Sequence, residues 1–235
     1  MQRALQRVGR ERDAEAAREA ILNAAETIFA RDGFSGARVD DIAQSAGYNK
    51  ALIFHYFDDK LGLYRALMSR TKERVFAQLN AAFDRFFGNG DEAGASEGAV
   101  RVSAGRIRDF AAACMQVTFG YYQEHPEAAR MLAWEAAEGW QTYVSCLPQT
   151  PSSWASRVMA LFQQAQAAGI VRADLDPQLL FLTVMSLPLI HMISLPRYAL
   201  VFPEADFASS EALSYAREQL TELVLRGTLA HPEEE

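Results

Sequence analysis

The chain has 235 residues, of which 50% are hydrophobic and 23% are charged, an ordinary balance for a soluble globular protein. This length can bury at least one complete core and leaves room for one or two domains. The formal net charge of −7 does not favour a nucleic-acid partner for the chain as a whole. However, residues 1–75 carry 13 basic and 11 acidic side chains, and the remaining residues carry 10 and 19. A polyanion contact is therefore expected in the first third.

The N-terminal residues mix charges without an apolar run, so we expect no secretory signal and a cytoplasmic protein. A first helix is predicted over residues 13–31. Its apolar residues recur at helical spacing, and Asp32 and Gly33 end it. The stripe consists of Ala17, Ile21, Leu22, Ala25, Ile28 and Phe29.

Two short helices joined by a tight turn are predicted next, over about residues 39–46 and 50–56. In the first of them, Val39, Ile42, Ala43 and Ala46 form one apolar stripe. Gly47 suits the left-handed residue that ends a helix. Asn49 can cap the second helix, and Ile53 and Phe57 then point toward the same core. This pattern indicates a helix-turn-helix, whose second helix can enter the major groove of DNA.

Helical patterns continue to the end of the chain. A long helix begins near Asp58 or Asp59 and reaches Phe87, and the glycine-rich segment 88–98 is predicted to be a flexible loop. The later helices are expected over 103–124, 126–139, 152–168, 177–197 and 209–229, and the tail 231–235 is expected to fray.

The most apolar run is 179–195, LLFLTVMSLPLIHMISL. It is slightly short of the ~20 residues that a membrane span needs, and Pro188 and His191 interrupt it. We therefore expect a helix buried against other helices, and no membrane partner. Together with the amphipathic helix 209–229 it could bury a face too large for one subunit, which suggests a homodimer interface formed by the helices at about 177–197 and 209–229.

No pattern of catalysis or metal binding is evident. There is no glycine-rich phosphate loop, nucleophile elbow or cluster of His and Cys ligands, so we expect neither an enzyme nor a metal or cofactor site. Cys114 and Cys146 are expected to be buried thiols, although a disulfide between them remains an alternative.

The residues from FARDGF through VDDIAQSAG to NKALIFHYFDDKLGLY resemble the TetR-type bacterial transcriptional regulators. The resemblance covers about residues 15–67, and the rest matches in outline only. It implies an all-α fold: a three-helix helix-turn-helix DNA-binding domain followed by a C-terminal helical bundle for ligand binding and dimerisation, about nine helices in all. It also implies a palindromic double-stranded DNA operator and a small-molecule effector.

The resemblance implies roles for individual residues of the second short helix. Lys50, Ala51 and Phe54 are expected to face base edges, where lysine can donate to guanine and the apolar groups can pack on a thymine methyl; His55 lies near the same surface. Phosphate contacts are expected from Arg38, Asn49, Tyr56 and Lys60. Many relatives have Thr where Arg38 stands and Tyr where Phe54 stands.

The segment before the first helix carries Arg3, Arg7, Arg10 and Arg12. Such arms can lie along the minor groove or the phosphates, and an alternative is a disordered tail that only improves solubility. We therefore expect residues 1–12 to form a basic N-terminal arm.

In proteins similar to this family the C-terminal region encloses a ligand cavity, and ligand binding there changes the separation of the two DNA-reading heads. Large side chains in this region are candidates for its wall, although most aromatic residues at helical spacing belong to a core. An apolar and aromatic pocket would favour a hydrophobic effector. The candidates are Phe110, Cys114, Met131, Trp134, Trp140, Phe162, Met185 and His191.

The sequence thus predicts a DNA-binding domain at 13–57 and an effector-binding and dimerisation domain at 58–230, with the helix 58–87 joining them. We expect a regulator whose affinity for its operator falls when a hydrophobic ligand binds. Two alternatives stay open: an activator of the same architecture, and a helical ligand-binding protein or enzyme in which the helix-turn-helix is only scaffold.

Overall fold

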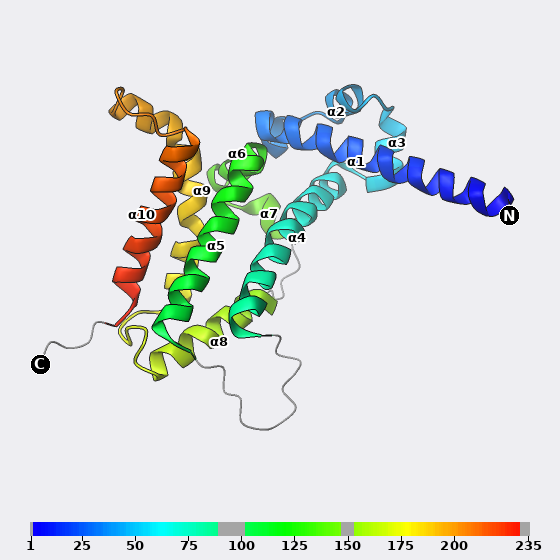
Figure 1. The fold of residues 1–235 in the computed structure, drawn as a ribbon. Helices are drawn as coiled ribbons and strands as arrows, with labels where there is room; N and C mark the ends of the chain where they lie inside the picture. The colour runs from blue at the N-terminus through cyan, green and yellow to red at the C-terminus, as the bar shows by residue number, and fades with distance from the viewer. Residues whose placement is uncertain (1, 89–101, 147–152, 231–235) are drawn as a thin grey trace, which may run out of the picture. The chain divides into compact units, whose positions relative to one another are not determined.

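The computed structural model describes residues 2–88, 102–146 and 153–230, with side chains from Arg12 onward except that of Ser153. Within these ranges it is built from ten α-helices and one isolated β-bridge, which confirms the all-α class (Figure 1). The helix missing from the sequence prediction is α7. The glycine-rich segment from residue 89, the segment with Pro148 and Pro151, and the tail 231–235 lie outside the described residues.

The helical bounds follow the predicted order closely. The helices are α1 (Gln2–Gly36), α2 (Val39–Ala46), α3 (Lys50–Phe57), α4 (Lys60–Phe87), α5 (Ala104–Glu124), α6 (Pro126–Ala137), α7 (Gln141–Cys146), α8 (Ser153–Ala167), α9 (Pro177–Val201) and α10 (Ser210–Thr228).

Helix α1 is longer than predicted at both ends. The residues expected to form a separate arm continue the helix to Gln2, because their Arg, Gln, Ala and Leu favour helix and no proline interrupts them. At the other end, Gly33 has φ 69° and kinks α1. A Cβ atom at Gly33 would lie 3.1 Å from Cδ2 of Trp134, so both backbone conformation and space favour glycine there.

The turn between α2 and α3 has the predicted chemistry. Gly47 adopts φ 74°, and the Tyr48 N–H donates to the Ala43 carbonyl at 3.0 Å, which closes the end of α2. The Asn49 side chain caps α3 by accepting from the Leu52 N–H at 2.8 Å. Asp59 caps α4 in the same way, through the Gly62 N–H at 2.6 Å.

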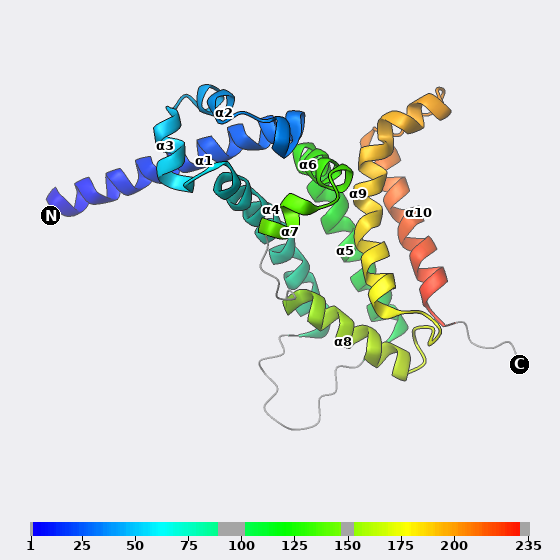
Figure 2. The same ribbon diagram turned by 180° about the vertical axis from the view of Figure 1, so that it is seen from behind.

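The chain divides into two compact units. The first comprises residues 1–73 and 126–149, and the second comprises residues 74–125 and 150–235. Helix α4 thus contributes to both, and α6 and α7 belong to the first unit although the sequence prediction included them in the domain at 58–230. Figure 2 shows the same helices from behind.

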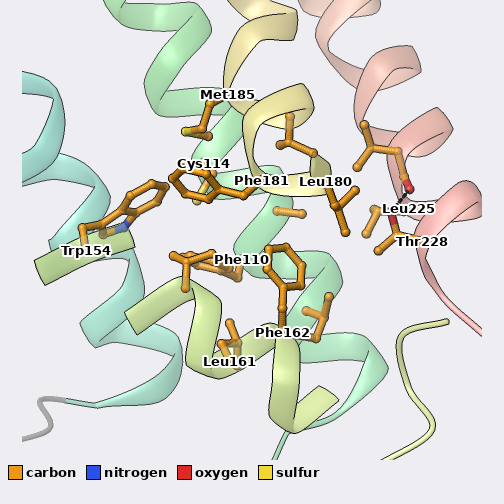
Figure 3. Close-up of a pocket in the computed structure, with 15 residues that line it drawn as sticks. Phe110, Cys114, Trp154, Leu161, Phe162, Leu180, Phe181, Met185, Leu225 and Thr228 are labelled. Atoms are coloured by element: carbon orange, nitrogen blue, oxygen red, sulfur yellow. Dashed lines mark hydrogen bonds between the residues drawn. The ribbon is translucent and has the colours of Figure 1, made fainter. Parts of the chain in front are cut away.

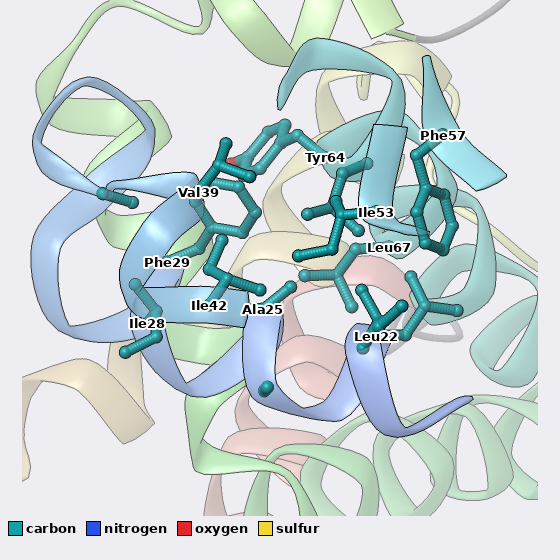
Figure 4. Packing of buried hydrophobic residues seen from close by; sticks show 14 of the residues in the cluster. Leu22, Ala25, Ile28, Phe29, Val39, Ile42, Ile53, Phe57, Tyr64 and Leu67 are labelled. Atoms are coloured by element: carbon teal, nitrogen blue, oxygen red, sulfur yellow. The ribbon is translucent and has the colours of Figure 1, made fainter. Parts of the chain in front are cut away.

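The first unit has a core contributed by six helices. Leu22, Ala25 and Phe29 of α1 pack with Ile42 of α2, Ile53 and Phe57 of α3, and Leu63 and Leu67 of α4 (Figure 4). Met131 of α6 belongs to the same cluster, as does Cys146 of α7. The helix-turn-helix is therefore held by α6 as well as by α1 and α4.

A buried carboxyl group joins α4, α6 and α7 within this unit. Glu135 is only 1% exposed; its Oε1 accepts from the Tyr64 hydroxyl at 2.6 Å, and its Oε2 accepts from the Tyr143 N–H at 2.9 Å. Nearby, Trp134 Nε1 donates to the Ala30 carbonyl of α1 at 3.3 Å. Burial and Glu135 raise the pKa of Tyr64 far above its usual value, so its hydroxyl stays a donor.

The second unit packs α5 against α9 and α10, with α8 against α9. Its core holds Leu79 and Phe83 of α4, Phe110 of α5, and Trp154 and Leu161 of α8. The isolated β-bridge pairs Val171, between α8 and α9, with Leu229, which directly follows α10.

The expectation that packing within the chain buries residues 179–195 is wrong. Pro188 is the buried residue of α9, and its other side chains are half-buried or exposed. By length and composition α9 could also cross a membrane. Exposed apolar surface of this kind is typical of an interaction site.

Candidate nucleic-acid interface and effector pocket

Helix α3 separates its side chains into a buried and an exposed side. Ile53 and Phe57 lie in the core of the first unit. The residues predicted to face bases, Lys50, Ala51, Phe54 and His55, are all exposed. One helix face thus anchors α3, and the opposite face presents a cation, a methyl group and two aromatic rings to solvent.

Lys50 lies in a defined local environment. Its Nζ donates to Oδ2 of Asp40 in the first turn of α2 at 3.0 Å, and it lies 5.8 Å from the centre of the Phe54 ring. The sequence prediction did not identify Asp40 as part of this surface. The two residues are ten positions apart, but the turn brings the start of α2 next to the start of α3.

The residues predicted to contact phosphates differ in their exposure and in their contacts. Arg38 precedes α2 and is exposed, and it makes no side-chain cap for that helix. Tyr56 is half-buried, with its ring 5.4 Å from that of His55. Asn49 uses its oxygen for the α3 cap, so its amide N–H groups are the part that can still donate.

Lys60 is more constrained than its neighbours. Its Nζ donates to the Ser35 carbonyl at 3.4 Å and lies 4.7 Å from the centre of the Phe34 ring. Partial burial lowers the pKa of Lys60. Its ammonium group is thus held at the end of α1.

A pocket lies in the second unit, among α5, α8, α9 and α10 (Figure 3). Its cavity volume is about 50 Å³, and the larger gap between its lining residues, about 560 Å³, includes open solvent. Of its 15 lining residues none is charged. The predicted candidates Phe110, Cys114, Phe162 and Met185 line it together.

The polar groups of this lining are few. The Thr228 hydroxyl donates to the Val224 carbonyl at 2.6 Å. Burial raises the pKa of the Cys114 thiol to about 12, so it is neutral at physiological pH. Trp154 Nε1 is buried and has no hydrogen-bond partner among the described residues. Such a lining selects against charged molecules.

Four other predicted candidates do not line this pocket. Met131 lies in the core of the first unit, and Trp134 and Trp140 belong to that unit as well. His191 is on α9, between the rings of Phe119 and Tyr198, and partial burial lowers its pKa. Met131 and Trp134 miss the pocket because the large side chains of α6 lie against the helix-turn-helix core rather than a cavity.

Sequence reasoning missed several lining residues of the pocket. They include Trp154, Leu161, Leu180 and Phe181, none of which was among the candidates selected from the sequence. Their position at the meeting of four helices depends on long-range packing. The apolar run 179–195 was the one feature of the sequence that indicated some of these lining residues.

Sequence comparisons match both parts of the chain. The family described as "Bacterial regulatory proteins, tetR family" matches residues 21–67, and "Tetracyclin repressor-like, C-terminal domain" matches residues 111–224. The chain is 28% identical over 193 residues to an HTH-type transcriptional repressor of Streptomyces coelicolor, covering 82% of this chain and 83% of that protein. It is 26% identical over 221 residues to the HTH-type transcriptional repressor NicS of Pseudomonas putida, covering 93% and 95%.

Solved structures show the same fold. A TetR family transcription regulator from Marinobacter aquaeolei superimposes with a TM-score of 0.64 at 19% identity, covering 94% of this chain and all of that one. A ketosteroid transcriptional regulator of Mycobacterium tuberculosis gives 0.60 at 15% identity, covering 91% and 95%. Matches to the family's N-terminal and C-terminal domains, together with the helix-turn-helix and the all-α fold, show that this chain belongs to the TetR family of bacterial DNA-binding transcriptional regulators.

Proposed function

We propose that this chain is a transcriptional repressor that leaves its operator when a small, uncharged, hydrophobic molecule binds in the pocket of the second unit. The observation that carries this proposal is the division of α3 into an anchored face and a solvent-facing one, in a chain that also encloses an uncharged pocket. The relatives with which it aligns over most of its length are named repressors.

Each exposed residue of α3 has a role that matches its chemistry. The Lys50 ammonium group can donate to O6 or N7 of a guanine, and Ala51 and Phe54 can pack against a thymine methyl. Arg38, Tyr56 and Lys60 contact phosphates, which sets the position of α3 along the groove without reading sequence. His55 is placed to take either role.

The effector class follows from the lining of the pocket. A charged ligand would lose its hydration without gaining an opposite charge, because no lining residue is ionised. A neutral aliphatic or aromatic molecule instead gains from burying its surface against Phe110, Phe162 and Met185. We therefore assign the pocket to a neutral hydrophobic effector.

A homodimer through α9 and α10 is part of this proposal. Leu179, Leu182 and Ile190 recur at helical spacing on α9 and are exposed, and Leu182 is 60% exposed. On α10, Leu223 is 66% exposed and lies two turns after exposed Tyr215. Two copies of such a face can bury each other, and a two-fold dimer presents two α3 helices to a palindromic operator.

DNA reading is tested with Lys50→Ala/Tyr56→Ala, because the pair removes one base contact and one phosphate contact. A good base contact is worth roughly 1–3 kcal/mol, so the variant should bind its operator at least about tenfold more weakly. The measurement is a gel-shift titration on the upstream region of the gene at several salt concentrations. Arg85→Ala on α4, which removes a charge outside the helix-turn-helix, is the matched control and should bind normally. Unchanged binding by the double variant would contradict the proposed reading surface.

The effector pocket is tested with the neutral dye N-phenylnaphthylamine, whose fluorescence rises in apolar surroundings. Wild-type protein should bind the dye and lose operator affinity as it does so. Ala111→Phe places a ring in the pocket, so it should bind the dye at least about tenfold more weakly while still binding DNA. Trp140→Phe, in the first unit, should bind the dye like wild type. The assignment is wrong if Ala111→Phe binds the dye like wild type and Trp140→Phe binds it more weakly.

The dimer is tested with Leu182→Glu/Leu223→Glu, because a buried carboxylate without a partner strongly disfavours an interface. Sedimentation equilibrium should show a dimer for wild type and a monomer for the variant. Val144→Glu places the same charge on an exposed aliphatic position of α7 and should remain dimeric. A dimeric double variant would place the interface elsewhere.

A further inference from the structure

The ion pair between Lys50 and Asp40 is an unexpected feature of a surface that meets a polyanion. Lys50 Nζ and Asp40 Oδ2 are 3.0 Å apart, and both side chains are well exposed, at 46% and 69%. An exposed pair of this kind contributes little to stability, generally less than about 1 kcal/mol. The fold therefore does not depend on this pair.

A carboxylate at this place is unfavourable for contact with phosphate. Asp40 lies in the first turn of α2, and Lys50 is the first residue of α3, so the pair lies where both helices begin. A cation at a helix N-terminus is disfavoured by the helix dipole, and the neighbouring carboxylate offsets that effect. The side chains thus hold each other in place before DNA arrives.

The pair presents hydrogen-bond donors beside hydrogen-bond acceptors. The ammonium group has three donors, of which one is used by Asp40, and the carboxylate keeps further lone pairs for other donors. In the major groove a G·C pair presents O6 and N7 of guanine as acceptors and the N4 amino group of cytosine as a donor. An A·T pair also has an amino donor, N6 of adenine, but it lies between the two acceptors N7 and O4. The thymine O4 acceptor then lies where cytosine has its amino group, and would face the carboxylate unfavourably.

We propose that Asp40 and Lys50 act as one unit that reads a single G·C base pair in each operator half-site, with Lys50 donating to guanine and Asp40 accepting from cytosine. The proposal rests on the assignment of Lys50 as a base reader, made above. It adds Asp40 as a specificity-determining residue on α2. Asp40 raises the preference for one base pair while lowering affinity for DNA in general, because its charge is repelled by phosphates.

The test is selection of binding sites from a random double-stranded DNA library, with the full-length protein and sequencing of the bound pool. The variants are Asp40→Asn and Lys50→Gln, which keep side-chain size and remove charge. Wild type should select a G·C pair at one position of each half-site. Both variants should lose at least about fivefold of the preference at that same position, as expected for a base contact of about 1 kcal/mol or more.

Asp41→Asn is the matched control, since it removes the neighbouring carboxylate of the same helical turn and should leave the preference unchanged. Melting temperatures of all variants check that the exposed substitutions leave the fold intact. The inference is overturned if Asp40→Asn relaxes no position, relaxes a position different from that of Lys50→Gln, or only raises affinity for every sequence. A preference for A·T at the shared position would also overturn it.

Failure of the proposed function gives a different result. If Lys50→Gln leaves every preference of the selected site unchanged, the assignment of Lys50 as a base reader fails, and the inference about Asp40 fails with it. If Lys50→Gln relaxes one position and Asp40→Asn relaxes none, the reading role of Lys50 stands and the inference alone is wrong.

Discussion

The first unit depends on the hydrogen bonds of one buried carboxyl group. Glu135 accepts from the Tyr64 hydroxyl of α4 and from the Tyr143 N–H at α7, so both of its oxygens have partners inside the protein. A buried carboxyl group without such partners would be strongly destabilising, since each unpaired buried polar group costs about 1–3 kcal/mol and a charged one more. The same bonds hold α6 and α7 against the core that supports α3. The position of α3 therefore depends on residues such as Glu135 and Tyr143, which come much later in the sequence.

The chain joins the second unit to the first directly at the end of α5. Helix α5 carries Phe110 and Cys114 of the pocket and ends at Glu124, and α6 begins at Pro126 after the single residue His125. Glu135 and Trp134 fix α6 to the helix-turn-helix core. Under the proposed function, the route along the chain from the pocket-lining helix α5 to α6 is therefore only one residue long. In the proposed dimer, a small displacement of the two DNA-reading heads is enough to spoil their fit to the operator, since half-sites are spaced by about one turn of DNA.

The sequence predicted the local features of this protein well and the long-range ones poorly. Gly47, the Asn49 cap and the apolar positions of α2 and α3 were predictable, because each depends on residues within one or two helical turns. Trp134 and Trp140 were candidates for the wall of the pocket, yet they belong to the first unit. Helical periodicity indicates which side of a helix packs against the rest of the chain, but not which part of the chain it packs against. The pair between Asp40 and Lys50 was likewise invisible until the turn had placed the two helix starts together.

Native-state hydrogen exchange tests most directly whether α6 is part of the reading head. In wild type, the slowest amides of α6 should open with the same free energy as those of α1 and α3, as expected for one cooperative unit. Glu135→Leu leaves the Tyr64 hydroxyl and the Tyr143 N–H without their acceptor, so it should lower that free energy for α6 and for α1–α3 together, by roughly 1–3 kcal/mol or more. The account is contradicted if α6 opens far more readily than α1 in wild type, or if the substitution leaves the exchange of α1–α3 unchanged.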